Sequence, residues 1–320
     1  MHFLDFEQPL EELHKILDDV QHSPHLDPKA KAESVNMLTQ RIEQTRQKIY
    51  ENLTAWQRVQ VARHPERPYT LYYIKQLCSE FTELHGDRNF RDDKAIVGGL
   101  GIMDGQTVML IGQQKGNDIK SRQYRNFGMP NPEGYRKALR LMKMAERFDI
   151  PIVTLIDTPG AFPGIDAENR GQAQAIAQNL YEMAKLTCPV ICVVIGEGAS
   201  GGALGIGVGN TVAMLENTWY TVISPEACSA ILWRTADQKM IAAEALKLTA
   251  KDALEIGVIE EIIPEPIGGA HINPAVTAEN LRAFLHKEIN KLKALTKDEL
   301  VNQRITKFSK LSKFNEKEEA

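Results

Sequence analysis

Short β-rich runs that alternate with helical patterns restrict the fold of this chain more than any other feature of its sequence. The runs cover residues 95–103, 107–112, 152–156, 190–195, 212–215, 219–223 and 258–263. Such alternation predicts an α/β core in which helices connect the strands. The first two runs are joined by Asp104-Gly105, a pair that is typical of a tight hairpin turn. We therefore expect a mixed sheet.

Helices are predicted between and after these runs, from N-terminal capping residues and from apolar residues that recur at helical spacing. One begins at Asn131, which can act as the N-cap, with Pro132 in the first turn and apolar residues at helical spacing behind it. Further helices are predicted at about residues 169–186, 276–295 and 297–308.

An N-terminal helical region precedes the predicted sheet. One stripe lies on residues 9–20, and a longer helical pattern runs from about residue 29 to residue 62. Two such helices predict a hairpin, which either covers the core or forms an arm that reaches a partner subunit. Pro65 and Pro68 end the region. We therefore expect an N-terminal helical arm, residues 1–68, and a main domain, residues 69–320.

Two glycine-rich segments each follow a predicted buried strand. Residues 157–164 read DTPGAFPG, and residues 196–203 read GEGASGGA. A strand followed by a tight glycine turn and a helix start leaves backbone N–H groups unpaired, with the positive end of the helix dipole behind them. Such a turn favours an anion or a developing oxyanion.

Two familiar motifs overlap in the second segment. Gly196, Gly198 and Gly201 form the G-x-G-x-x-G pattern of dinucleotide-binding proteins, with Glu216 twenty residues further on. Gly198, Ser200 and Gly202 form G-x-S-x-G, which would make Ser200 a hydrolase nucleophile. The available histidines downstream are His271 and His286. An NAD-binding Rossmann oxidoreductase and a serine hydrolase are thus two alternative functions.

A third interpretation needs no side-chain base. Two turns of N–H donors at strand ends would form an oxyanion hole for an enolate or enolate-like anion. No histidine lies between His85 and His271, the stretch that contains both glycine turns. Of the three interpretations, only this one is favoured by the absence of histidine from that stretch.

Several longer motifs resemble one family of proteins. They are AIVGG at 95–99, QKG at 114–116, RNFGMP at 125–130, PEGYRKA at 132–138, IDTPGA at 156–161 and IPEP at 263–266. Together with FLDFE at 3–7, they resemble the α subunit of bacterial acetyl-CoA carboxylase carboxyltransferase over nearly the whole chain. The resemblance implies a crotonase-like fold, a spiral of ββα units whose anion holes are built from backbone amides.

The resemblance also implies a reaction and its partners. Carboxybiotin, carried on a separate biotin carboxyl carrier protein, delivers a carboxyl group to acetyl-CoA and gives malonyl-CoA, the first committed step of fatty acid biosynthesis. A separate biotin carboxylase uses ATP to carboxylate the biotin. The α subunit stabilises the ureido oxygen of biotin, and a β subunit with a zinc ribbon holds the thioester enolate in an α2β2 assembly.

Site residues follow from the matching motifs. The resemblance implies Gly201 and Gly202 as the amide donors, with Gly160 and Ala161 as the opposite wall. The substrate-binding residues that we expect are Gly198, Ser200, Lys115, Arg122 and Arg125, and we expect no metal ligand in this chain.

Four positions depart from the usual sequence of the family. Ala199 stands where glycine is commoner, Phe162 where tyrosine is, Gln113 where histidine is, and Ala227 where glycine is. We expect the change at Ala199 to matter most, because a Cβ restricts positive φ in a turn that presents amides.

Basic residues are concentrated between positions 115 and 147. Arg136, Arg140, Lys143 and Arg147 recur on one face of a predicted helix. This face either contacts CoA phosphates, the carrier or an acidic partner, or carries ordinary salt bridges in solvent. For Arg122 and Arg125, in a polar loop, we favour function.

Charge and composition exclude other classes of partner. The net charge is −4, from 38 basic and 42 acidic side chains, so no overall field attracts nucleic acid or an anionic membrane. The N-terminal residues lack the pattern of a signal peptide. The four cysteines form no CxxC pair, so we expect free thiols, no zinc site and a cytoplasmic protein.

Overall fold

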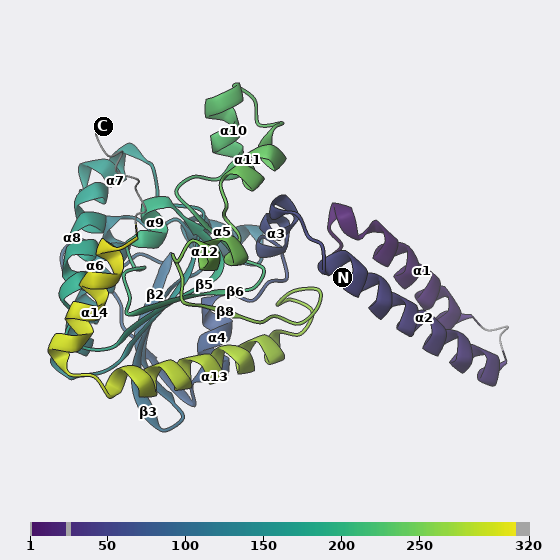
Figure 1. Cartoon of the computed structure of the whole chain (residues 1–320), viewed down its shortest axis with the longest axis horizontal. Helices are drawn as coiled ribbons and strands as arrows, with labels where there is room; N and C mark the ends of the chain where they lie inside the picture. The colour runs from purple at the N-terminus through teal and green to yellow at the C-terminus, as the bar shows by residue number, and fades with distance from the viewer. Residues whose placement is uncertain (1, 24–26, 312–320) are drawn as a thin grey trace, which may run out of the picture.

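A mixed eight-stranded sheet forms the centre of the molecule, and a helical hairpin projects from it (Figure 1). The computed structural model describes residues 2–23 and 27–311. Strand order is β1-β2-β3-β4-β5-β6-β8, and β7 pairs with β5. Pairing is antiparallel from β1 to β3 and parallel from β3 onwards. The predicted mixed sheet is confirmed.

The strands follow the predicted runs closely. Their bounds are β1 Glu80–Glu83, β2 Ile96–Met103, β3 Gln106–Gln113, β4 Ile152–Thr158, β5 Val190–Ala199, β6 Thr211–Leu215, β7 Trp219–Thr221 and β8 Glu261–Ile263. All seven predicted runs contain a strand, whereas β1 was not predicted. The hairpin turn between β2 and β3 is also confirmed, since Asp104 and Gly105 have φ of 50° and 78°.

Helices cover both faces of the sheet. Their bounds are α4 Thr70–Leu77, α5 Ile119–Tyr124, α6 Pro132–Arg147, α7 Ile165–Asn169, α8 Gln172–Lys185, α9 Ser200–Leu204, α10 Pro225–Trp233, α11 Lys239–Ala245, α12 Ala250–Glu255, α13 Pro274–Lys293 and α14 Lys297–Ser309. Short 3-10 turns lie at Asp5–Glu7 and Asn126–Gly128. Along the described chain, no helix is both long and apolar enough to cross a membrane.

Successive side chains of the central strands point to opposite faces of the sheet and pack into two separate hydrophobic cores. Met109 and Ile111 of β3 pack with α6 and α8, whereas Val108 and Leu110 pack with α4 and α13. This period of two is what a strand buried on both faces produces. The carboxyl ends of β3, β4 and β5 are thereby held in fixed register, and the functional turns follow them.

One predicted helix start differs from the structure in detail. Asn131 occupies the N-cap position of α6, but its side chain makes no capping hydrogen bond. Arg170 lies 3.3 Å from the Asn131 side-chain oxygen instead. The predicted capping role of the Asn131 side chain is therefore wrong, although Pro132 does begin the helix.

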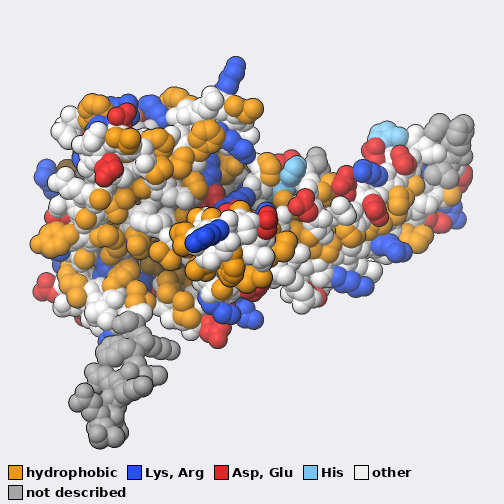
Figure 2. Space-filling model, turned by 90° about the horizontal axis from the view of Figure 1, so that it is seen from above, with side chains coloured by type: hydrophobic (Ala, Val, Ile, Leu, Met, Phe, Trp, Pro, Cys, Tyr) orange, Lys and Arg blue, Asp and Glu red, His pale blue; other side chains and the backbone are white. Residues whose placement is uncertain are grey.

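The N-terminal hairpin consists of α1, Gln8–His22, and α2, Pro28–Tyr50. It extends away from the sheet in Figure 1, and Figure 2 shows acidic and basic side chains along it. The described segments confirm the two-helix prediction, but the continuous helix to residue 62 is wrong. Helix α2 ends at Tyr50, and a new helix, α3, covers Ala55–Ala62. The Thr54 hydroxyl caps α3 by accepting a hydrogen bond from the Gln57 amide.

Helix α3 packs on the main domain rather than on the hairpin. Trp56 and Val59 are buried with Ala199 and Trp219, so α3 lies against β5 and β7. The division of the chain at residue 68 stays a prediction.

Candidate active site

The two glycine turns meet at one cavity. The first turn follows β4, and the second follows β5 and opens α9. They line a cavity of about 570 Å3, whose walls include Gly160, Ala161, Ser200, Gly201 and Gly202. The structure thus brings together all four predicted catalytic residues and Ser200. The opposite rim, residues 222–224 and Ala227, was not predicted as part of the site.

The two turns touch through Gly202. A Cβ at position 202 would lie 2.5 Å from Ala161 N and 2.6 Å from Gly160 C. Both distances are shorter than the contacts that Cβ atoms make in proteins. Gly202 is therefore required by close approach and not by an unusual φ. Gly201 is different, since a Cβ there would meet only Ile176, at 3.7 Å.

The left-handed residue of the second turn is Ser200, with φ of 55°. Ala199 has φ of −105° and ψ of 127°, ordinary extended backbone, and is buried beside Trp219. The expectation that Ala199 disturbs the turn is therefore wrong, because its Cβ meets no conformational restriction. Strain of this kind at Ser200 is typical of functional turns.

Amide groups of α9 supply the candidate donors. Helix α9 has five residues, and the first four N–H groups of any helix have no acceptor within it. Gly201 and Gly202 belong to this first turn. On the other side, Gly160 N donates to the Thr158 hydroxyl at 3.1 Å, so Gly160 forms wall and not donor.

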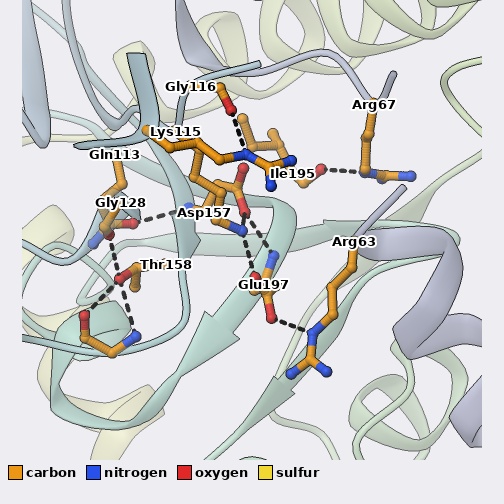
Figure 3. A network of polar contacts seen from close by, with 12 residues as sticks. Arg63, Arg67, Gln113, Lys115, Gly116, Gly128, Asp157, Thr158, Ile195 and Glu197 are labelled. Atoms are coloured by element: carbon orange, nitrogen blue, oxygen red, sulfur yellow. Dashed lines mark hydrogen bonds and ion pairs between the residues drawn. The ribbon is translucent and has the colours of Figure 1, made fainter. Parts of the chain in front are cut away.

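A buried ion cluster lies behind the turns (Figure 3). Lys115 Nζ is 2.6 Å from both Asp157 Oδ1 and Glu197 Oε2. Arg63 Nε is 2.7 Å from Glu197 Oε1, and Arg63 also pairs with Glu226. Asp157 additionally accepts from the Glu197 amide at 2.9 Å. The cluster therefore ties the ends of β3, β4 and β5 to α3 and α10.

Burial and charge act in opposite directions within this cluster. Burial raises the pKa of Asp157. Burial also opposes ionisation of Glu197, but Lys115 and Arg63 outweigh it and lower the pKa of Glu197. The Lys115 pKa is raised, because its two carboxylate partners outweigh the effect of burial. Lys115 is thus held as a cation in the interior.

The other predicted binding residues lie elsewhere. Lys115 and Arg122 line a separate polar cavity of about 210 Å3 with Arg63, Tyr69 and Phe127 among its walls. Arg122 Nε donates to Gly116 O at 3.1 Å, and an Arg125 guanidinium nitrogen donates to Lys94 O at 2.9 Å. Gly198 is an internal residue of β5, opposite Tyr220. Ser200 alone of these five lines the glycine cavity.

The basic face of α6 is largely occupied within the chain. Arg136 lies 2.9 Å from Asp87, Arg140 donates to Gly86 O at 3.0 Å, and Lys143 is 2.7 Å from Glu182. These contacts favour the interpretation as ordinary intramolecular salt bridges over a phosphate-binding face.

Neither overlapping motif has the geometry that its chemistry needs. Gly196 and Gly198 lie inside β5, so they do not form the turn of a dinucleotide site. His271 stacks on His64 with ring centres 3.6 Å apart, and His286 hydrogen-bonds to Asn290. Neither histidine lines the cavity that Ser200 lines. A nucleophilic serine would need such a base.

Solved structures share this fold. A chain of the Pseudomonas malonate decarboxylase hetero-tetramer matches with a TM-score of 0.58 and 17% identity, over 74% of this chain and 92% of that one. Transcarboxylase 12S matches with a TM-score of 0.56 and 19% identity over 71% of this chain, which spans 42% of the transcarboxylase chain. The predicted crotonase-like α/β fold is confirmed.

Sequence comparison identifies the family. The model described as acetyl co-enzyme A carboxylase carboxyltransferase-like matches residues 3–312. Relatives from Flavobacterium psychrophilum and Chlorobium phaeovibrioides, both named acetyl-coenzyme A carboxylase carboxyl transferase subunit alpha, are each 58% identical to this chain. The first match covers 99% of this chain and 100% of the relative, and the second covers 98% of each. The chain therefore belongs to the family of acetyl-coenzyme A carboxylase carboxyl transferase alpha subunits.

Proposed function

We propose that the two glycine turns form the oxyanion hole for the biotin side of acetyl-CoA carboxyl transfer. The observation that carries this proposal is the meeting of both turns at one cavity, with Gly202 against Gly160 and Ala161. The Gly201 and Gly202 amides donate to the ureido oxygen of biotin. Because these donors are fixed by the fold, they stabilise developing negative charge without reorganising.

Carboxybiotin supplies the carboxyl group and, after the carboxyl group has left, the base for the acetyl-CoA methyl group. This chain then has to bind and orient carboxybiotin and stabilise the negative charge on its ureido oxygen. These tasks need no catalytic histidine. The cavity fits such a role, since backbone amides and small side chains line it at the α9 end. Ser200, Lys115, Arg122 and Arg125 remain candidate binding residues, the last three outside this cavity.

The chain is expected to act within a larger assembly. We propose a zinc-ribbon β subunit in an α2β2 complex, a biotin carboxyl carrier protein, and an ATP-using biotin carboxylase. The relatives' designation as subunit alpha supports this proposal. Exposed apolar side chains support it too, at Ile231, Leu232, Trp233, Met240 and Ile241 of α10 and α11. Four free cysteines fit a reducing compartment such as the cytoplasm.

The test of the assembly is reconstitution. We expect the purified chain alone to form no malonyl-CoA, and to form it with a β partner, acetyl-CoA and carboxylated biotin. The physical reason is that charge develops on two oxygens, those of biotin and of the thioester, and the proposed hole serves one of them. Radiometric malonyl-CoA formation is the measurement. Turnover by the lone chain would contradict the two-subunit proposal.

Ser200→Ala tests whether any hydroxyl chemistry is involved. We expect the reconstituted complex to keep most of its turnover, losing less than about tenfold, because neither downstream histidine lines the cavity to activate the hydroxyl. Loss of a true serine nucleophile costs on the order of a million-fold in kcat. Steady-state kinetics after a thermal melt provide the measurement. A loss of several orders of magnitude in a folded complex would restore the hydrolase interpretation.

A further inference from the structure

One buried side chain touches both glycine turns. Gln113, the last residue of β3, is fully buried. Its Nε2 donates to Gly202 O at 2.8 Å, and its Oε1 accepts from Asp157 N at 2.9 Å. The contact to Asp157 lies near the end of β4, at the first residue of the first glycine segment, as Figure 3 shows. A single amide group thus connects the strand end with the helix turn.

The carbonyl that Gln113 binds has no partner within its own helix. Helix α9 ends at Leu204, and its last carbonyl groups need hydrogen-bond donors from outside the helix. Gly202 O receives two donors, Gln113 Nε2 and the Tyr135 hydroxyl, the latter at 3.2 Å. The position of the Gly202 peptide therefore depends on side chains of β3 and α6.

We propose that Gln113 is a positioning residue that sets the α9 amides against the first glycine turn. It contacts no substrate and acts through Gly202 and Asp157. This inference rests on the proposed function of those amides. Since Gly202 already touches Gly160 and Ala161, a small shift of the turn changes the width of the hole. Misplacement by about 1 Å can cost roughly a hundredfold in rate.

The contacts at position 113 require a group that donates on one side and accepts on the other. A glutamine amide does this at every pH, whereas a carboxylate of the same shape only accepts. A protonated carboxyl group both donates and accepts. The charged or titratable groups around this position are Asp157 on β4, Lys115 after β3, Glu197 on β5 and Tyr135 on α6.

The experiment compares three variants in the reconstituted complex. We expect Gln113→Ala to lower kcat by roughly tenfold to a hundredfold with little change in the KM for acetyl-CoA. We expect Gln113→Glu to be impaired at high pH and to recover, relative to the unmodified complex, as the pH falls and the carboxyl group gains a proton. Thermal melts at the same pH values separate the two roles, because a purely structural role would make the melting temperature and kcat recover together, whereas a positioning role changes kcat of a complex that stays folded throughout.

Gln114→Ala is the matched control. Gln114 is also buried, but it accepts from Leu71 N and donates to Lys115 O, so it touches neither turn. We expect nearly unchanged turnover from this variant. Equal activities of Gln113→Ala and Gln114→Ala would overturn the proposal. If Gln113→Ala fails to fold, a pH-independent activity ratio for Gln113→Glu would overturn it instead. An inactive unmodified complex would refute the proposed function itself, which separates the two failures.

Discussion

Gly202→Val is expected to reduce malonyl-CoA formation by the reconstituted complex roughly a hundred- to a thousandfold. A side chain at position 202 would place its Cβ 2.5 Å from Ala161 N, so the two glycine turns must move apart. Loss of one oxyanion donor typically costs about 2.7–4 kcal/mol of transition-state stabilisation. The loss should fall on kcat for carboxyl transfer and leave the KM for acetyl-CoA close to normal, since the proposed oxyanion hole serves biotin.

Gly201→Ala is the control variant. It tests whether activity is lost because the two glycine turns move apart or because the site tolerates no side chain at all. Its Cβ would meet Ile176 at 3.7 Å, an ordinary contact, so the turn can keep its shape. We expect a smaller loss than for Gly202→Val. Both variants are first checked by thermal melts, and each substrate is then varied separately. Near-normal turnover of folded Gly202→Val would place the anion hole in another loop.

Arg67→Met is expected to lower the free energy of unfolding by about 3–5 kcal/mol, since it leaves a buried carboxylate without its cation. The Arg67 and Glu265 side chains are 1% and 0% exposed. Arg67 Nε also donates to Ile195 O at 2.9 Å, at the inner part of β5. Urea denaturation of the isolated chain measures the change.

Two comparisons test the cause of that loss. The double variant Arg67→Met with Glu265→Gln should recover much of the stability, because the uncompensated charge is gone. Arg282→Met breaks a pair with Asp104 whose side chains are 35% and 37% exposed, so it should cost less than about 1 kcal/mol. Equal losses from Arg67→Met and Arg282→Met would contradict the assignment to burial.

Local patterns were enough to predict the sheet, whereas the placement of the two turns opposite each other was implied by the family resemblance. Apolar runs marked seven strands, and Asp104-Gly105 marked the hairpin, because both features act over a few residues. Strand β1 escaped prediction because its sequence, EFTE, has a single large apolar side chain. The break before α3 was missed because the apolar stripe of α2 continues in register to Trp56, which belongs to another core.

Details of the site depend on contacts between distant residues. The sequence marked Gln113 only as a departure from the family, whereas its role comes from Gly202, 89 positions away. The change at Ala199 was expected to matter most because a Cβ restricts positive φ, yet the left-handed backbone is at Ser200. Spacing in one segment does not show which residue carries the unusual φ.

The Arg67–Glu265 pair has a consequence for synthesis on the ribosome. The two residues are 198 positions apart, so at ~5–20 residues per second Glu265 is made roughly 10–40 s after Arg67. Throughout that interval the nascent chain carries an arginine whose buried partner does not yet exist. Closure of the segment between α3 and α4 onto the sheet must therefore wait for the region beyond β8. A ribosome stalled before Glu265 would present a chain that proteases can cut near Arg67.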